Sequence, residues 1–155
     1  MTDAQRRGAL VYLNNLLRAC AYSGGKAFEA VLVGEPSGKA DIPPQMGALV
    51  AFWLAGEAEK EATLRNVMVR EEIRLRVYLR AAVGEEARFE LEVDAWNAMR
   101  NVQAAIRGAS TLGGNVTDLE IDTANVVWVD LSGLMYRVVE MTIVLWDTEA
   151  EEIAA

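Results

Sequence analysis

The chain has 155 residues, a formal net charge of −8 and a sequence pI near 4.6. The length fits one domain spanning 1–155, and the acidic balance argues against a nucleic-acid binder, which needs basic groups to neutralise phosphates. Because the chain has no histidine, it can hold neither a His-based triad nor a His-ligated metal. No apolar run reaches the roughly 18 residues of a membrane span, and the N-terminus lacks signal-peptide features. We therefore expect a cytosolic protein with no membrane contact.

Apolar residues are abundant for a chain of this size. Hydrophobic residues, tyrosine included, make up 52% of the chain before its 12 glycines are counted. An ordinary soluble domain has about 45–50% with glycine included. The surplus suggests more apolar surface than one small core consumes, as in a subunit of an oligomer.

The N-terminal segment is predicted to be an amphipathic helix. Thr2 or Asp3 can cap it, its apolar residues keep the 3.6-residue period, and Ser-Gly-Gly at 23–25 is expected to end it. A short strand is predicted for 27–33. The loop that follows, 34–45, is expected to be irregular and exposed. That loop holds the three prolines of the chain: Pro36, Pro43 and Pro44.

The chain is organised around its longest alternating segment, 66–83. Period-2 alternation predicts a long antiparallel strand, long enough to project beyond a compact core. It is preceded by 47–56, in which odd- and even-numbered positions are both apolar. This pattern predicts a central strand that is covered on both faces. The polar connection between them, 57–63, is expected to be solvated or to meet a basic partner. Its acidic residues are Glu57, Glu59 and Glu61.

The 66–83 strand has one apolar face and one face rich in arginine. Glu71 is the exception on the apolar face, and since a lone buried carboxylate is costly, we expect it at a sheet end or beside an arginine such as Arg137. The opposite face is either solvated or an assembly surface. We predict that it meets acidic residues of a neighbouring subunit or of its hairpin partner strand, and not DNA. This arginine face comprises Arg70, Arg74, Arg76 and Arg80.

A second helix is predicted after Gly84, where the hydrophobic period changes from 2 to 3.6, with Arg107 and Gly108 at its end. One apolar stripe of this helix is interpreted as core and not as a cofactor site. The stripe comprises Phe89, Val93, Trp96, Met99, Val102 and Ile106.

The last third of the chain predicts a β-hairpin. A turn-rich connector at 110–115 precedes two alternating segments, 119–130 and 135–146, and the acidic end, 147–155, is expected to fray. The whole order predicts an α+β fold, an antiparallel or mixed β-sheet with two helices packed on one face and a long projecting β-hairpin.

Side chains suited to chemistry are sparse. Cys20 lies in an apolar helical segment and is interpreted as a buried thiol. Gly113 and Gly114 lack the Lys-Ser or Lys-Thr that follows a phosphate-binding glycine loop. The scattered acidic residues have no recognisable metal-site spacing. We therefore expect no enzyme activity, no cofactor and no metal.

The order of elements resembles that of the tail terminator, or tail completion, proteins of long-tailed bacteriophages and related gene transfer agents. In that family an N-terminal helix precedes a projecting β-hairpin, and a second helix leads through a turn into a final hairpin. The resemblance rests on AAIRGASTLGGNV at 104–116 and on YRVVEMTIVLWD at 136–147. Here 111–114 match the family's turn, and Tyr136 with Arg137 match the aromatic–arginine pair that begins the last strand.

The resemblance implies a structural virion protein of the tail neck, assembled in the host cytoplasm. Such a protein forms a homo-oligomeric ring, usually a hexamer, that caps the finished tail tube and stops its polymerisation. The ring presents a docking face to the head-side connector, and DNA passes through its channel without specific binding.

Two other classes of function stay open. One is a neighbouring structural role, as a head–tail adaptor, a stopper or a tube-like ring subunit. The other is a soluble enzyme or ligand-binding domain with a deep pocket near Glu71 or Glu140. For the terminator, we expect the loops at 34–45 and 57–63 to become ordered on the tube or the connector.

Overall fold

The computed structural model describes residues 1–36, 47–62, 66–81, 83–131 and 133–150. Helix α1 (Asp3–Ala19) begins at a capping box. The Thr2 hydroxyl accepts a hydrogen bond from the Gln5 amide, and the Gln5 side chain accepts one from the Thr2 amide. Thr2 is therefore the N-cap, one of the two residues predicted for that position.

Helix α1 ends earlier than predicted. Its last residue is Ala19, and strands β1 (Ala21–Ser23) and β2 (Lys26–Ala27) form a small hairpin directly after it. Gly24 and Gly25 occupy the two-residue turn with φ of 51° and 82°, which is the conformation that a type I′ hairpin turn requires. The Ser-Gly-Gly stretch therefore forms the turn of this hairpin and does not end the helix. The strand predicted at 27–33 is shorter in the structure, where β3 spans Ala30–Val33.

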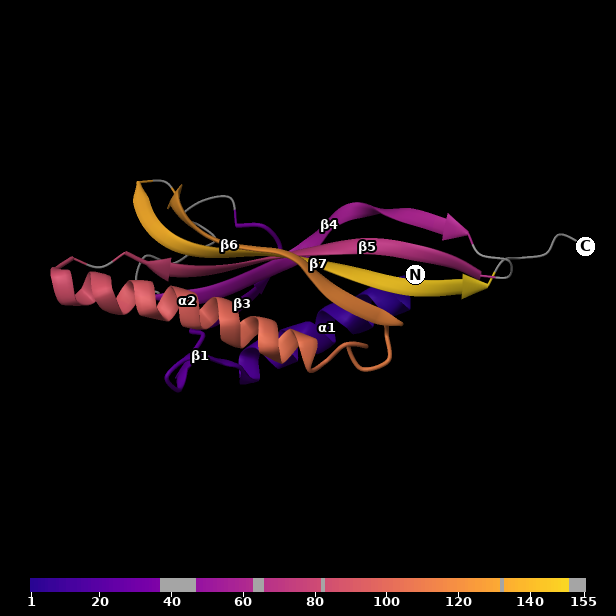
Figure 1. Ribbon diagram of the computed structural model, residues 1–155, viewed down its shortest axis with the longest axis horizontal. Helices are drawn as coiled ribbons and strands as arrows, with labels where there is room; N and C mark the ends of the chain where they lie inside the picture. The colour runs from indigo at the N-terminus through magenta and orange to yellow at the C-terminus, as the bar shows by residue number, and fades with distance from the viewer. Residues whose placement is uncertain (37–46, 63–65, 82, 132, 151–155) are drawn as a thin grey trace, which may run out of the picture.

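The main sheet has five strands in the order β3-β4-β5-β7-β6 (Figure 1). Strand β3 is parallel to β4 (Ala48–Ala62), and the other neighbours are antiparallel. Those strands are β5 (Asn66–Arg80), β6 (Asp118–Leu131) and β7 (Leu134–Ala150). The sheet is therefore mixed, and the predicted α+β fold with two helices is confirmed.

Strand β5 pairs with β7 along its whole length, from Asn66 opposite Ala150 to Arg80 opposite Tyr136, and with β4 from Val67 to Leu79, with a bulge in β4 between Leu54 and Glu59. Consequently β4, β5 and β7 extend together past the helices (Figure 1). Two boundary predictions are wrong for this reason. The polar connection begins after Ala62, because 57–62 still belong to β4 and 59–62 pair with β5. Residues 147–150 do not fray, because they continue β7. Residues 151–155 lie outside the described residues.

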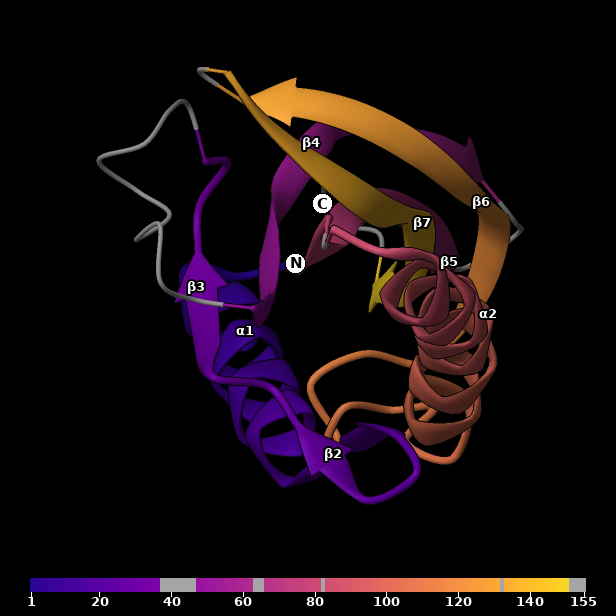
Figure 2. The same ribbon diagram turned by 90° about the vertical axis from the view of Figure 1, so that its left-hand side faces the viewer.

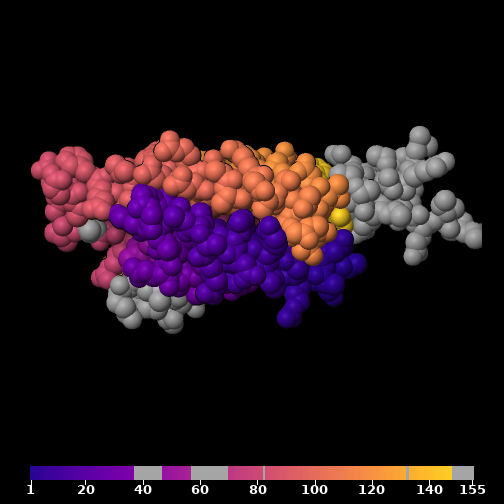
Figure 3. All heavy atoms as spheres, turned by 90° about the horizontal axis from the view of Figure 1, so that it is seen from below, coloured from indigo at the N-terminus to yellow at the C-terminus, as the bar shows by residue number. Residues whose placement is uncertain are grey.

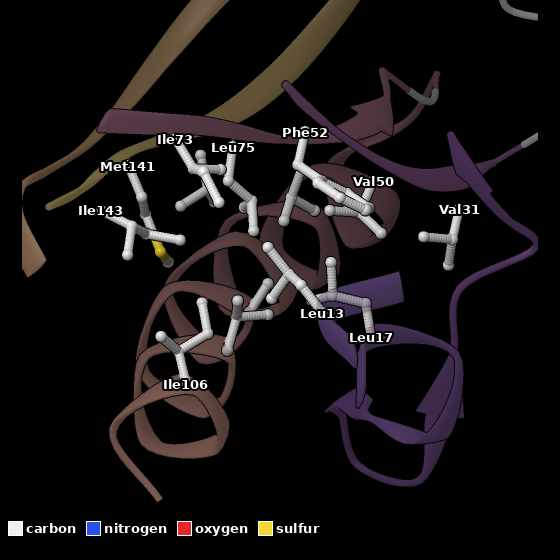
Figure 4. Packing of buried hydrophobic residues seen from close by; sticks show 14 of the residues in the cluster. Leu13, Leu17, Val31, Val50, Phe52, Ile73, Leu75, Ile106, Met141 and Ile143 are labelled. Carbon is white, nitrogen blue, oxygen red and sulfur yellow. The ribbon is translucent and has the colours of Figure 1, made fainter. Parts of the chain in front are cut away.

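Helix α2 (Glu85–Arg107) lies beside α1 on the same face of the sheet (Figure 3). The core forms between this helix layer and the sheet. Leu13 and Leu17 of α1 meet Phe52 of β4 (Figure 4), and the apolar face of β5 is buried from Ile73 to Leu79, as predicted. The β5 residues of this core are Ile73, Leu75, Val77 and Leu79.

The second face of the sheet carries a smaller core of its own. The sheet curves so that the β6–β7 end turns over toward β4 (Figure 2). Tyr78 and Tyr136 meet there edge to face, with ring centroids 5.9 Å apart. Leu49, Ala51 and Val138 are buried with them.

Candidate interaction surfaces

Among the described residues, no group of three or more His, Cys, Asp or Glu side chains is placed to hold a metal ion. Within those same residues, neither helix combines the length and apolarity needed to cross a membrane. Cys20 caps α1 and packs against the core, and burial raises the pKa of its thiol. It is therefore a poorly activated nucleophile, because the thiolate is the reactive form.

Glu71 meets an arginine, as expected, but not Arg137. Its carboxylate is buried against Arg6 of α1, with the Arg6 Nη2 to Oε1 distance at 2.6 Å. Arg137 instead donates to Glu92 of α2, at 2.7 and 2.8 Å, and lies over the Trp128 ring. Arg6 thus links helix α1 to strand β5, whereas Arg137 links strand β7 to helix α2.

The arginine face is partly occupied by contacts within the chain. The Arg76 side chain lies 3.2 Å from Glu140 and 5.5 Å from the Trp53 ring centroid. The Arg70 side chain lies 3.3 Å from Glu72 and over the Trp146 ring. Arg74 and Arg80 are exposed. The predicted role of this face in assembly stays a prediction.

The prolines and glutamates that were predicted to lie in exposed loops have other positions wherever the structure describes them. Pro36 is buried. The backbone of Glu57, Glu59 and Glu61 belongs to β4, so these residues extend a strand and are not at a loop tip. Pro43 and Pro44 lie outside the described residues.

The aromatic stripe of α2 is the main disagreement with the sequence prediction. Phe89, Val93 and Trp96 are 59, 57 and 52% exposed. The second half of the predicted stripe is confirmed as core, because Val102 and Ile106 are buried and Met99 packs partly buried against them, together with Leu91, Ala95 and Ala98. The first half of the stripe is wrong because steps of three residues wind around a helix. At about 100° per residue, Val93 and Val102 lie on opposite sides. We name Phe89, Val93 and Trp96 the α2 stripe.

A second exposed apolar surface lies between α1 and the edge strand β3. It is a groove of about 620 Å³ in which Val11 and Val33 are 50 and 60% exposed. Its helical wall runs from Asp3 to Arg18 and has one arginine toward each end, Arg7 and Arg18. We name it the α1–β3 groove; it is lined by Asp3, Arg7, Leu10, Val11, Asn14, Arg18, Val31 and Val33.

These two surfaces lie at opposite edges of the molecule. Helix α1 packs beside β3, which ends one side of the sheet, while α2 packs on β5, β7 and β6, toward the other side. Figure 2 shows α1 with β3 on one side and α2 with β6 on the other. A contact between the surfaces of two copies would therefore be heterologous, with different patches on the two partners.

The acidic residues of α2 differ in their surroundings. Lys26 binds Asp94 and Glu90 at 2.8 and 2.5 Å, and these hydrogen bonds raise the pKa of the lysine. Glu85 and Glu86 are exposed in the first turn of the helix, where the helix dipole favours acidic groups. Negative charge thus borders the N-terminal end of the α2 stripe.

The turn that carries the family resemblance packs on α1. Leu112, Gly113 and Gly114 have φ of 46°, 72° and 86°, and the Asn115 side chain donates to the Leu112 carbonyl at 2.7 Å. A Cβ on Gly113 would lie 2.7 Å from the Tyr12 ring. Glycine is needed at this position, since a side chain would be strained and would clash.

No protein-family model matches this chain, and neither does any curated protein. The features that indicate a function are therefore the two apolar surfaces and the resemblance of the element order.

Proposed function

We propose that this chain is a structural subunit of a bacteriophage tail, the terminator that forms a ring on the finished tail tube. In this role it stops polymerisation of the tube and presents a docking face to the head-side connector. The observation that carries the proposal is the pair of exposed apolar surfaces, the α2 stripe and the α1–β3 groove, on opposite edges of one sheet.

Two different patches on opposite edges favour a closed ring over a dimer. A twofold dimer uses the same patch on both partners, so it would leave the other surface exposed. Head-to-tail contacts use both surfaces on every copy. The net charge of −8 also suits the wall of a channel through which DNA passes, because DNA does not adhere to an acidic surface.

The arm formed by β4, β5 and β7 supports contact with a partner outside the ring. It extends past the helices as three paired strands (Figure 1), and a paired segment is stiffer than a lone hairpin. A stiff arm can engage the last tube subunits without a large ordering cost.

The test is the mass of the protein in solution, followed by negative-stain imaging with purified tail tubes. We expect a ring of several subunits that binds one end of the tube and prevents further addition of tube protein. A monomer at tens of micromolar protein, both alone and with tube protein, would contradict the proposal. Binding only to the head-side connector would favour the adaptor or stopper role.

A further inference from the structure

We propose that the α2 stripe of one copy docks into the α1–β3 groove of a second copy. In this contact Trp96 stacks on Arg7, and Glu85 pairs with Arg18, of the second copy. The inference rests on the proposed function and deepens it, because it assigns the two faces through which neighbouring ring subunits meet.

Tryptophan contacts within the chain give the first reason. The chain has four tryptophans, and three of them, Trp53, Trp128 and Trp146, have an arginine guanidinium 5.0 to 6.0 Å from the ring centroid. Among the described residues, no such cation is recorded over Trp96, which is half exposed. An arginine from outside would give Trp96 the same cation–π contact as the others.

The spacing of charged and aromatic groups gives the second reason. Glu85 and Trp96 are eleven residues apart on α2, and Arg7 and Arg18 are eleven residues apart on α1. Each pair therefore spans about 16 Å of helix. Because the spacings are equal, Glu85 and Trp96 of one copy can contact the two arginines of the second copy at the same time.

The apolar residues fall between these two pairs. Phe89 and Val93 lie between Glu85 and Trp96 along α2, while Leu10 and Val11 lie between the two arginines on α1. Val33 of β3 forms the opposite wall of the groove. The centre of the contact is therefore apolar and its ends are charged, as in stable protein interfaces.

The directions of the two helices give the third reason. They determine which arginine contacts Glu85 and which contacts Trp96. Within one chain α1 and α2 run in opposite directions (Figure 1). If the ring axis runs along the helices, rotation about it preserves those directions, so α2 of one copy meets α1 of the next in antiparallel orientation. The start of α2, with Glu85, then lies beside Arg18 near the end of the second copy's α1.

The first experiment compares the solution mass of matched variants. We expect Val93→Asp and Val11→Asp to reduce the ring to monomers that keep the wild-type circular dichroism spectrum. Ala104→Asp and Asn15→Asp add the same charge to exposed positions of the same helices, outside both surfaces, and should keep the ring. Arg7→Gln should weaken the contact between copies roughly 2- to 30-fold, the range of one cation–π contact.

The second experiment identifies the paired faces by disulfide trapping in a Cys20→Ala background. Val93→Cys chains mixed with Val11→Cys chains should cross-link as one-to-one dimers under mild oxidation, whereas each variant alone should not. A chain carrying both cysteines should give a ladder of covalent multimers. The double reversal Glu85→Arg with Arg18→Glu should restore the ring that either single reversal weakens.

The outcomes separate this inference from the proposed function. A wild-type ring that survives Val93→Asp and Val11→Asp, or Val93→Cys chains that cross-link to one another, overturns the assigned faces and leaves the ring itself intact. A wild-type monomer in the presence of tube protein overturns the proposed function and the assigned faces with it. Loss of the ring in both aspartate variants, with mixed cross-linking, supports the assignment.

Discussion

Arg6 of helix α1 donates three hydrogen bonds of 2.6 to 3.2 Å to Glu71 of strand β5, from Nε and Nη2 to the two carboxylate oxygens. Glu71 is only 6% exposed, on the face of β5 that otherwise holds the core. The pKa of Arg6 is raised, mainly by its hydrogen bond to Glu71. This pair fastens the N-terminal helix to the end of the sheet from which the arm extends.

We expect Arg6→Met to lower the free energy of unfolding by about 2 kcal/mol, because it leaves the Glu71 carboxylate buried without its partner. Arg107→Met, at an exposed position at the end of α2, should cost less than about 0.5 kcal/mol. The double variant Arg6→Met, Glu71→Leu should recover most of the loss, since both charges are gone. Urea unfolding of the four proteins measures this, and equal losses for Arg6→Met and Arg107→Met would show that the pair contributes little.

Gly8 provides a second prediction, in which two effects oppose each other. Glycine to alanine inside a helix ordinarily stabilises by about 1 kcal/mol. Here a Cβ would lie 2.1 Å from Oδ1 of Asn115, and overpacking of this kind costs about 1–3 kcal/mol. We expect Gly8→Ala to destabilise the protein. In the Asn115→Gly background the same substitution should become neutral or stabilising, and thermal unfolding of the complete double-mutant cycle tests the coupling.

Tyr136 offers a test of an unsatisfied polar group. Its hydroxyl is buried, and no hydrogen-bond partner for it is found among the described residues. We expect Tyr136→Phe to leave stability unchanged or to raise it by up to about 1 kcal/mol. Tyr78→Phe is the matched control, because it removes a hydroxyl that accepts a hydrogen bond from Arg76 at 3.5 Å. A loss above about 1 kcal/mol for Tyr136→Phe would mean that its hydroxyl does have a partner.

The free energy of unfolding at alkaline pH should depend on the ionisation of the buried tyrosines. Burial raises the pKa of Tyr78 and of Tyr22, while an unfolded tyrosine titrates near pH 10. The folded state therefore holds these protons more tightly. The stabilisation is complete below about pH 10 and is lost as pH rises through the raised pKa values.

We expect Tyr78→Phe to show a shallower loss of stability than the wild type above about pH 10. Tyr12→Phe serves as the control, because it removes the same hydroxyl group from an exposed tyrosine. Urea unfolding at a series of pH values measures both. Identical slopes for the wild type and Tyr78→Phe would rule out this tyrosine as the source of the pH dependence.

The sequence by itself determined the elements whose signals are local. The alternation of 66–83 depends only on neighbouring residues, and it predicted β5 and its buried face. The capping box of Thr2 and Gln5 closes within one helical turn. The closing hairpin and the extent of α2 likewise follow from residues a few positions apart.

Only the tertiary structure decided which distant groups meet. Arg6 and Glu71 are far apart in the sequence, and nothing near either residue distinguishes Arg6 from Arg137 as the partner. The parallel pairing of β3 with β4 depends on where the chain returns after the intervening segment. The exposed side of α2 was also decided at this level. The helix has apolar residues on two faces, and the face with small Ala95 and Ala98 is the one buried, because small side chains allow the helix to approach the sheet closely.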